Sequence, residues 1–132
     1  MIVDSSAILA ILLGEEAAPA LLDALVDAAR PRMSVANWLE VAMVVEARGG
    51  RLASLRFDEF FRTAGIELAP VDAAQAEAAR TAWRYFGLHK HSARLNFGDC
   101  FAYALAKGEG ETLLFAGDDF SRTDIEPVIK EH

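Results

Sequence analysis

"MIVDSSAILAILLG", residues 1–14, contains the clearest structural pattern of the chain. A short apolar segment runs into Asp4, and a second apolar segment follows as far as Gly14. This pattern predicts a buried strand that passes directly into a helix, with Ser5 or Ser6 as the N-cap and Gly14 as the stop. An ionised carboxylate between two buried segments is unfavourable unless it is paired, hydrogen-bonded or bound to a metal ion. Another part of the chain must therefore stabilise Asp4.

Outward from this stretch, strand-like and helical patterns alternate along the chain. We expect further strands at residues 32–35, 66–71, 112–116 and 125–129, and further helices at residues 15–30, 34–48, 54–65, 72–86 and 97–110. This alternation is typical of an α/β fold with a mainly parallel sheet and helices on both faces. Because neither a repeat nor a linker is visible, we expect residues 1–132 to form one domain.

The composition narrows the class of protein. Of 132 residues, 53% are hydrophobic and 25% are charged, which is typical of a soluble globular chain. The net charge of -7 argues against non-specific duplex binding, although a nucleic-acid enzyme with metal ions and a local basic rim remains compatible. Cys100 is the single cysteine, and the apolar run at residues 7–13 is too short to span a membrane. We therefore expect a cytoplasmic protein without a membrane segment.

Acidic residues follow two of the expected strands. Asp4 ends the first strand, and Asp118 and Asp119 follow the strand at residues 112–116. In open parallel sheets, ligands bind beyond the carboxyl ends of the strands. Each acid also has a structural interpretation, because Asp4 suits a helix N-cap and the Asp-Asp pair suits a turn.

Two further acids lie within apolar helical segments. The neighbours of Glu40 one turn away are mostly apolar, so a solvated glutamate is not expected there. Asp99 stands three residues after Asn96, a spacing that also fits a capping box. If all these carboxylates meet at the mouth of one sheet, they repel each other unless a cation holds them. Oxygen ligands without a Cys-His cluster favour Mg²⁺ or Mn²⁺ over zinc, and such sites hydrolyse phosphodiesters.

Four segments together resemble a known family. The stretches at residues 1–12, 34–50, 95–107 and 112–125 read "MIVDSSAILAIL", "SVANWLEVAMVVEARGG", "LNFGDCFAYALAK" and "TLLFAGDDFSRTDI". In this order they resemble the PIN-domain ribonucleases and, more narrowly, the VapC toxins of bacterial VapBC toxin–antitoxin pairs. The resemblance implies a PIN-like three-layer sandwich with an acidic pocket. It also implies endonucleolytic RNA cleavage that depends on Mg²⁺ or Mn²⁺.

The resemblance also assigns the site residues. Asp4, Glu40 and Asp99 match the three invariant acids of the family. Many relatives place the fourth acid where this chain has Gly117, so the neighbouring Asp118 is the first candidate. In this assignment Asp4 and Asp99 hold the metal most directly, and the other two acids complete its cage and orient the attacking water. The expected catalytic and metal-binding set is Asp4, Glu40, Asp99 and Asp118, with Asp119 as the alternative fourth acid.

Contacts to RNA and to protein partners are expected as well. Ser6 matches a small hydroxyl residue beside the first acid, and Asn37 faces the pocket one turn before Glu40. The densest basic cluster either contacts RNA phosphates or is a solvated helix face and loop; it comprises Arg80, Arg84, His89, Lys90, His91 and Arg94. By resemblance, a VapB-type antitoxin and a second copy of the chain are partners. The antitoxin would lie on the helices rich in Leu21, Leu22 and Leu25 and in Phe57, Phe60 and Phe61, unless these residues are core.

Two other classes of protein compete with this interpretation. Phosphoacceptor domains also use an aspartate at a strand end, but a dehalogenase-like loop needs a second aspartate where this chain has Ser6. A receiver domain needs a lysine after a later strand, and "TLLFAGDD" has none. The second competitor is a catalytically silent PIN domain that only binds. Such domains usually lose acids of the pocket, whereas this sequence keeps them.

Overall fold

A parallel sheet of short strands forms the centre of the molecule. The computed structural model describes residues 1–87 and 91–130. In these ranges the sheet has the order β3-β2-β1-β4, and all neighbouring strands are parallel. The strands are β1 (Ile2–Val3), β2 (Arg32–Ser34), β3 (Glu67–Ala69) and β4 (Leu113–Leu114). The strand expected at residues 125–129 is reduced to an isolated bridge between Pro127 and Leu113, so that prediction is wrong.

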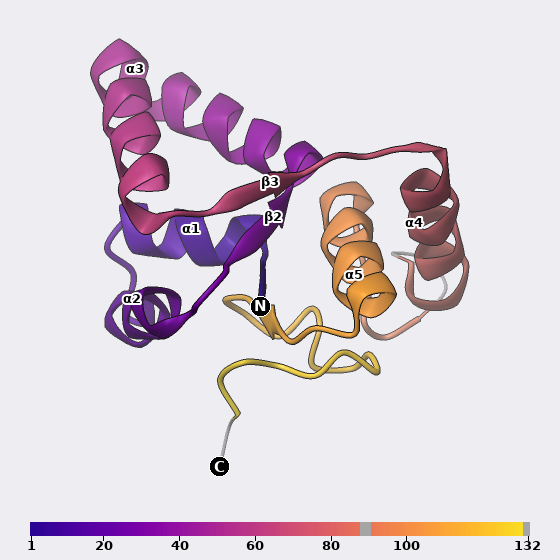
Figure 1. Cartoon of the computed structure of the whole chain (residues 1–132). Coiled ribbons are helices and arrows are strands. Elements are labelled where there is room, and N and C mark those ends of the chain that lie inside the picture. Colours follow the sequence, from indigo (N-terminus) through magenta and orange to yellow (C-terminus); the bar gives the residue numbers. More distant parts are fainter. Residues whose placement is uncertain (88–90, 131–132) are drawn as a thin grey trace.

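Helices cover both faces of the sheet. Figure 1 shows α1, α2 and α3 on one side of the strands and α4 and α5 on the other. This is the three-layer α/β sandwich expected from the sequence. The helices of the described ranges are α1 (Ser5–Leu12), α2 (Ala18–Asp27), α3 (Val35–Ala64), α4 (Ala73–Phe86) and α5 (Phe97–Glu109). No helix in the ranges 1–87 and 91–130 combines the length and the apolar character that crossing a membrane requires.

The strands fix the layers through the alternation of their side chains. Ile2 is paired with Leu113, and Val3 is paired with Leu114. Ile2 and Leu113 belong to the core that also contains residues of α4 and α5. Val3 and Leu114 belong to the core beneath α1, α2 and α3. Because successive strand residues point to opposite faces, two residues per strand are enough to anchor both helical layers.

Local signals in the sequence account for most helix ends. Ser34 and Asp72 cap α3 and α4 as predicted, each accepting a hydrogen bond from a backbone N–H of the first turn. The N-cap of α1 is Asp4 and not Ser5 or Ser6, because the Asp4 side chain accepts from the N–H of Ser6. Helix α2 is shorter than the expected range 15–30.

Helix α3 replaces the two helices expected at residues 34–48 and 54–65. Its backbone leaves helical geometry at Gly50, where φ is 71° and ψ is −160°. A side chain on Cβ disfavours this left-handed conformation, so glycine suits the position. In Figure 1 the two halves of α3 fold back on each other at this kink. The predicted interruption between the two helices is therefore present at Gly50, but no loop separates the two helical segments.

Candidate active site

The carboxyl ends of the parallel strands gather the acidic residues. Asp4 directly follows β1, and Asn37 and Glu40 lie in the first turns of α3, which follows β2. The Gly117–Asp119 turn follows β4. Asp99 lies in the first turn of α5. Strands that run in the same direction end at the same edge, so segments far apart in sequence meet there.

Asp4 is a buried carboxylate with one oxygen satisfied and one free. Its side chain is part of a residue only 2% exposed. Oδ2 accepts hydrogen bonds from the backbone N–H of Ser6 at 3.0 Å and from its hydroxyl at 2.6 Å. Oδ1 is buried without a hydrogen-bond partner. Burial, opposed by the Ser6 hydrogen bonds and reinforced by the charge of Glu40, raises the pKa of Asp4 to about 6.

Ser6 connects Asp4 to the end of β4. While its hydroxyl donates to Asp4, the same oxygen accepts a hydrogen bond from the backbone N–H of Ala116 at 3.0 Å. The Gly117–Asp119 turn begins at the next residue. Ser6 therefore fixes the position of Asp4 relative to the turn that carries Asp118 and Asp119.

Asp99 takes part in a helix capping box and also lies near the other acids. It forms a reciprocal capping box with Asn96: Asp99 Oδ2 accepts from the Asn96 N–H at 3.0 Å, and Asn96 Oδ1 accepts from the Asp99 N–H at 2.9 Å. Burial is the largest cause that raises the pKa of Asp99 to about 7. The charges of Asp4 and Asp119 and a hydrogen bond to the Asp119 carboxyl raise it further. Asp99 thus caps α5 and belongs to the acidic cluster at the same time.

Asp119, rather than Asp118, lies against this cluster. Asp119 is the member of the pair that shares a hydrogen bond with Asp99. Both aspartates are exposed, whereas the next residue, Phe120, is 2% exposed and packs against Phe115 with ring centroids 5.2 Å apart. The buried Phe120 ring fixes the turn, and the aspartate beside it faces Asp99.

Glu40 approaches the cluster from the solvent side. It is exposed, as are Leu39 and Met43, so the apolar surroundings expected for it are wrong. Its carboxylate lies against Gly98, where a Cβ atom would come within 2.6 Å of Oε2 and 2.8 Å of Oε1. Since the charge of Glu40 also raises the pKa of Asp4, the exposed glutamate lies near the buried aspartate. Gly98 makes this approach possible.

Asn37 is fully buried beneath the acids. Its Nδ2 donates to the backbone carbonyl of Gly98 at 2.9 Å, and its own backbone carbonyl accepts from the Ser5 hydroxyl at 3.3 Å. Its Oδ1 is buried without a hydrogen-bond partner. Asn37 therefore joins α3 to the first turn of α5, and so positions Glu40 and Asp99 relative to each other.

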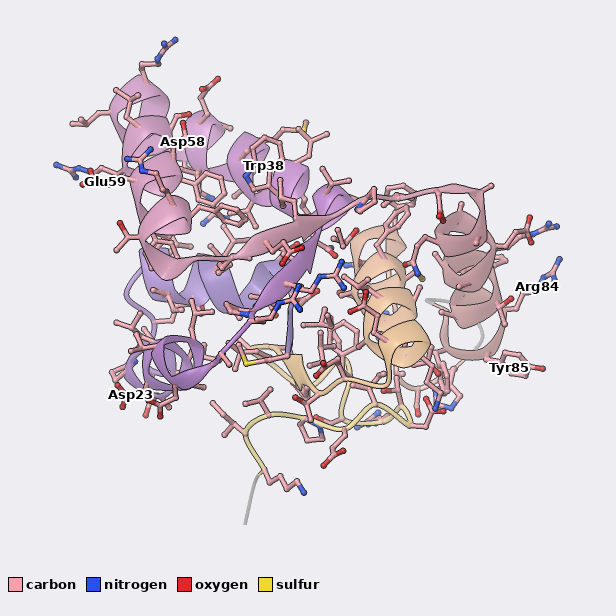
Figure 2. The ribbon with its side chains drawn as sticks, in the orientation of Figure 1. Asp23, Trp38, Asp58, Glu59, Arg84 and Tyr85 are labelled. Atoms are coloured by element: carbon pink, nitrogen blue, oxygen red, sulfur yellow. The ribbon has the colours of Figure 1, made fainter. Side chains whose placement is uncertain are left out.

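Only part of the basic cluster expected from the sequence lies near the acidic residues. Arg84 points outward from α4, away from the sheet (Figure 2). Arg80 is exposed on the same helix and lines a groove with Phe97. His91 has a structural role, because its Nδ1 accepts from the N–H of Ala93 and its ring packs edge-on against Phe86. Arg94 lines a cleft with Asp119. His89 and Lys90 lie outside the described residues.

The donor chemistry of the pocket fits a hard cation. The available donors are carboxylate oxygens, and a buried Asp4 oxygen lacks any hydrogen-bond partner. Within the described ranges, no three His, Cys, Asp or Glu side chains are gathered closely enough to hold a metal ion as they stand. This agrees with the electrostatics, since uncompensated carboxylates repel each other and the pKa values of Asp4 and Asp99 are raised.

Comparison with known families defines the class of protein. The PIN domain model matches residues 1–126. The match includes all strands and helices described above. The chain therefore belongs to the PIN domain family.

Within this family the resemblance to one group extends along nearly the whole chain. Ribonuclease VapC of Mycolicibacterium smegmatis is 45% identical over 128 residues, which cover 97% of this chain and 99% of the relative. Mycobacterium tuberculosis VapC20, solved as a toxin that cleaves the sarcin-ricin loop, superposes with a TM-score of 0.72 at 19% identity and covers 94% of this chain and 95% of its own. A toxin–antitoxin complex from Klebsiella pneumoniae gives 0.71 at 16% identity, covering 93% and 92%. The two structures share the fold.

Proposed function

We propose that this chain is a metal-dependent endoribonuclease and the toxin of a toxin–antitoxin pair, acting in the cytoplasm as one PIN domain of residues 1–132. The observation that carries the proposal is the buried Asp4 carboxylate with one unpartnered oxygen, within electrostatic reach of Glu40 on α3 and Asp99 on α5. A relative that is 45% identical over nearly its full length is named a ribonuclease, which supports RNA as the substrate.

We assign Mg²⁺ or Mn²⁺ to the pocket, held by Asp4, Asp99 and Asp119, with Glu40 completing the set from the mouth. The cation supplies charge neutralisation for the phosphate and lowers the pKa of a bound water. Asp119 takes the place of the first candidate, Asp118, because Asp119 is the acid in contact with Asp99.

The protein's own residues prepare the site for this role. Ser6 donates to Oδ2 of Asp4, which leaves Oδ1 for a ligand. Asn37 and the Asn96 capping box hold the first turn of α5, so Asp99 stays in place when its proton is lost. Glu40 is exposed, which suits it to orient a water molecule at the mouth. The mechanism needs no serine, cysteine or histidine nucleophile.

An antitoxin of the VapB type is the expected protein partner. Of the residues first considered for this contact, Leu21, Leu25 and Phe57 are core residues with at most 2% exposure. A groove of about 420 Å³ between α1 and α3 is the better surface, because it carries two arginines that suit acidic partner residues. Its apolar lining includes Leu9, Leu12, Leu13, Val44, Val45 and Leu52, and its arginines are Arg48 and Arg56.

A homodimer is the second expected assembly. Large aromatic side chains are exposed on the helical layer formed by α4 and α5, among them Trp83 and Phe97 with exposed fractions of 42% and 81%. Such a face is typical of an interaction site. It is separate from the α1–α3 groove, so one chain has room for both partners.

The test is cleavage of labelled RNA by the purified protein with Mg²⁺, with Mn²⁺ and with chelator. We expect metal-dependent cleavage that falls at least about 1,000-fold in Asp4→Asn, because a ligand is lost while the N-cap is kept. Asp58→Asn is the matched control, since Asp58 is exposed on the outer half of α3 (Figure 2). Cleavage that persists in Asp4→Asn, or well-folded wild-type protein that cleaves no RNA, would contradict the proposal. The second result would favour a silent binding module.

A further inference from the structure

A polar cleft opens beside the acidic cluster. It has a volume of about 400 Å³ and lies between the segment that precedes α5 and the turn that follows β4. Asp119, which contacts Asp99, is part of its wall, so the cleft begins at the proposed catalytic centre. Its lining is Ser92, Ala93, Arg94, Asn96, Asp118, Asp119 and Arg122.

Two arginines from segments far apart in the chain line this cleft. Arg94 comes from the segment before α5, and Arg122 comes from the turn after β4; both are exposed. Arg122 Nη1 lies 3.4 Å from the backbone carbonyl of Ser92, which brings the two walls together. In the ranges that the structure describes, neither arginine forms an ion pair, although two aspartates line the same cleft. Arg122 uses one N–H group on the Ser92 carbonyl, so the guanidinium group of Arg94 and the remaining N–H groups of Arg122 are available to a ligand.

The backbone of Arg94 adds an independent observation. Arg94 has a φ of 57°, which makes it the only residue other than glycine with positive φ in the described part of the chain. A side chain on Cβ makes this backbone conformation unfavourable. The conformation is held by a turn in which the Arg94 N–H donates to the His91 carbonyl at 3.1 Å. This turn places Arg94 at the wall of the cleft.

An anion that accepts two parallel hydrogen bonds is the ligand that suits two guanidinium groups without an ion-pair partner. A phosphodiester meets this requirement and accepts paired hydrogen bonds from arginine. The aspartates in the wall oppose an anion, but a cation at Asp119 would compensate one of them. The cleft therefore favours a phosphate that arrives together with the metal site, as the backbone of a bound RNA would.

We propose that Arg94 and Arg122 form a clamp for the RNA phosphate next to the one that is cleaved, on the side of Asp119. This rests on the proposed function and deepens it by naming the residues that position the substrate. Arg122 is a positioning residue that the sequence reasoning missed, because residues 94 and 122 are far apart in the chain and meet only through the fold.

The first test measures binding without cleavage. The probe is a labelled single-stranded RNA of mixed sequence, bound to the Asp4→Asn protein over a range of monovalent salt concentrations, with Mn²⁺ held in excess so that the weakened metal site stays occupied. Adding Arg122→Gln should weaken binding about tenfold and lower the salt slope by about 0.7, as expected when one phosphate contact is lost. Arg94→Gly should do the same, since glycine keeps the left-handed backbone. Arg62→Gln, which removes an exposed arginine in the last turn of α3, is the matched control.

The second test uses the active protein. Arg122→Gln and Arg94→Gly should raise KM about tenfold and change kcat less than about twofold, because the clamp positions the substrate and does not react. Arg122→Lys should keep the salt slope and recover part of the affinity. If the clamp variants match Arg62→Gln in both KM and salt slope, the clamp is wrong. If the wild type cleaves no RNA, the proposed function fails, and the salt slopes alone still decide the clamp.

Discussion

At the scale of single residues, the Asp4 carboxylate both caps helix α1 and offers an oxygen to a ligand. One oxygen performs the capping and is satisfied by Ser6, while the other is buried without a partner. An isolated buried carboxylate is unfavourable, and its raised pKa is the measure of that cost. The position is therefore explained better by a ligand than by the cap alone.

This reasoning predicts how acidity changes the stability of the metal-free protein. The pKa of Asp4 rises from 3.8 in a free carboxyl to about 6 in the fold, so the folded state binds the proton more tightly. The free energy of unfolding should then increase as the pH falls from about 7.5 to about 5, by roughly 1.4 kcal/mol from this group. Urea denaturation with chelator present measures the change. Asp4→Asn should flatten the pH dependence, leaving the share of Asp99; an unchanged profile would contradict the account.

The choice between Asp118 and Asp119 illustrates what sequence reasoning lacks at this scale. The motif "GDDF" places two equivalent acids side by side, and spacing alone does not show which one turns inward. The proposal of Asp119 rests on its interaction with Asp99 in the fold, beside the buried ring of Phe120. Glu40 shows the same limit, since apolar neighbours in the sequence did not reveal that its own face of α3 is exposed.

At the scale of elements, the contact between α3 and α5 determines the mouth of the pocket. Asn37 of α3 binds the carbonyl of Gly98 in α5, and Glu40 rests where a Cβ of residue 98 would be. Because Gly98 has no side chain, Glu40 of α3 can approach the first turn of α5, which carries Asp99.

Gly98→Ala tests this contact. The added Cβ would approach the Glu40 carboxylate to 2.6 Å, so the flexible glutamate must move and cleavage should fall about tenfold, while the fold is retained. Gly108→Ala on the same helix is the matched control, because its Cβ would meet only Gln75 Nε2 at 3.6 Å. RNA cleavage and thermal melting of both variants give the answer. Equal activity of the two would show that Glu40 does not need its present position.

The ends of helices were predicted best from the sequence. Ser34, Asp72 and the Asn96–Asp99 pair are short-range signals, and each acts as the predicted cap or capping box. Residues 125–129 do not form the predicted strand. A single bridge to Leu113 joins this segment to the sheet. Pairing between distant segments depends on the whole fold, which local patterns do not contain.

At the scale of the molecule, an acidic chain has to bind an acidic polymer. The net charge of -7 opposes RNA at long range. The fold compensates locally by placing Arg94 and Arg122 in one cleft beside the carboxylates, which a cation would neutralise. RNA binding should therefore depend on the metal as well as on the arginines.

The measurement that tests the central claim most directly is the titration of Mn²⁺ into the purified protein, followed by the paramagnetic resonance signal of the free ion. The account predicts binding that weakens at least about tenfold in Asp4→Asn, Asp99→Asn and Asp119→Asn, since each removes a charged ligand. Binding should be retained in Asp118→Asn and in Asp58→Asn, whose acids lie outside the set. Equal Mn²⁺ affinity in all five variants and the wild type would contradict a metal site built from these acids.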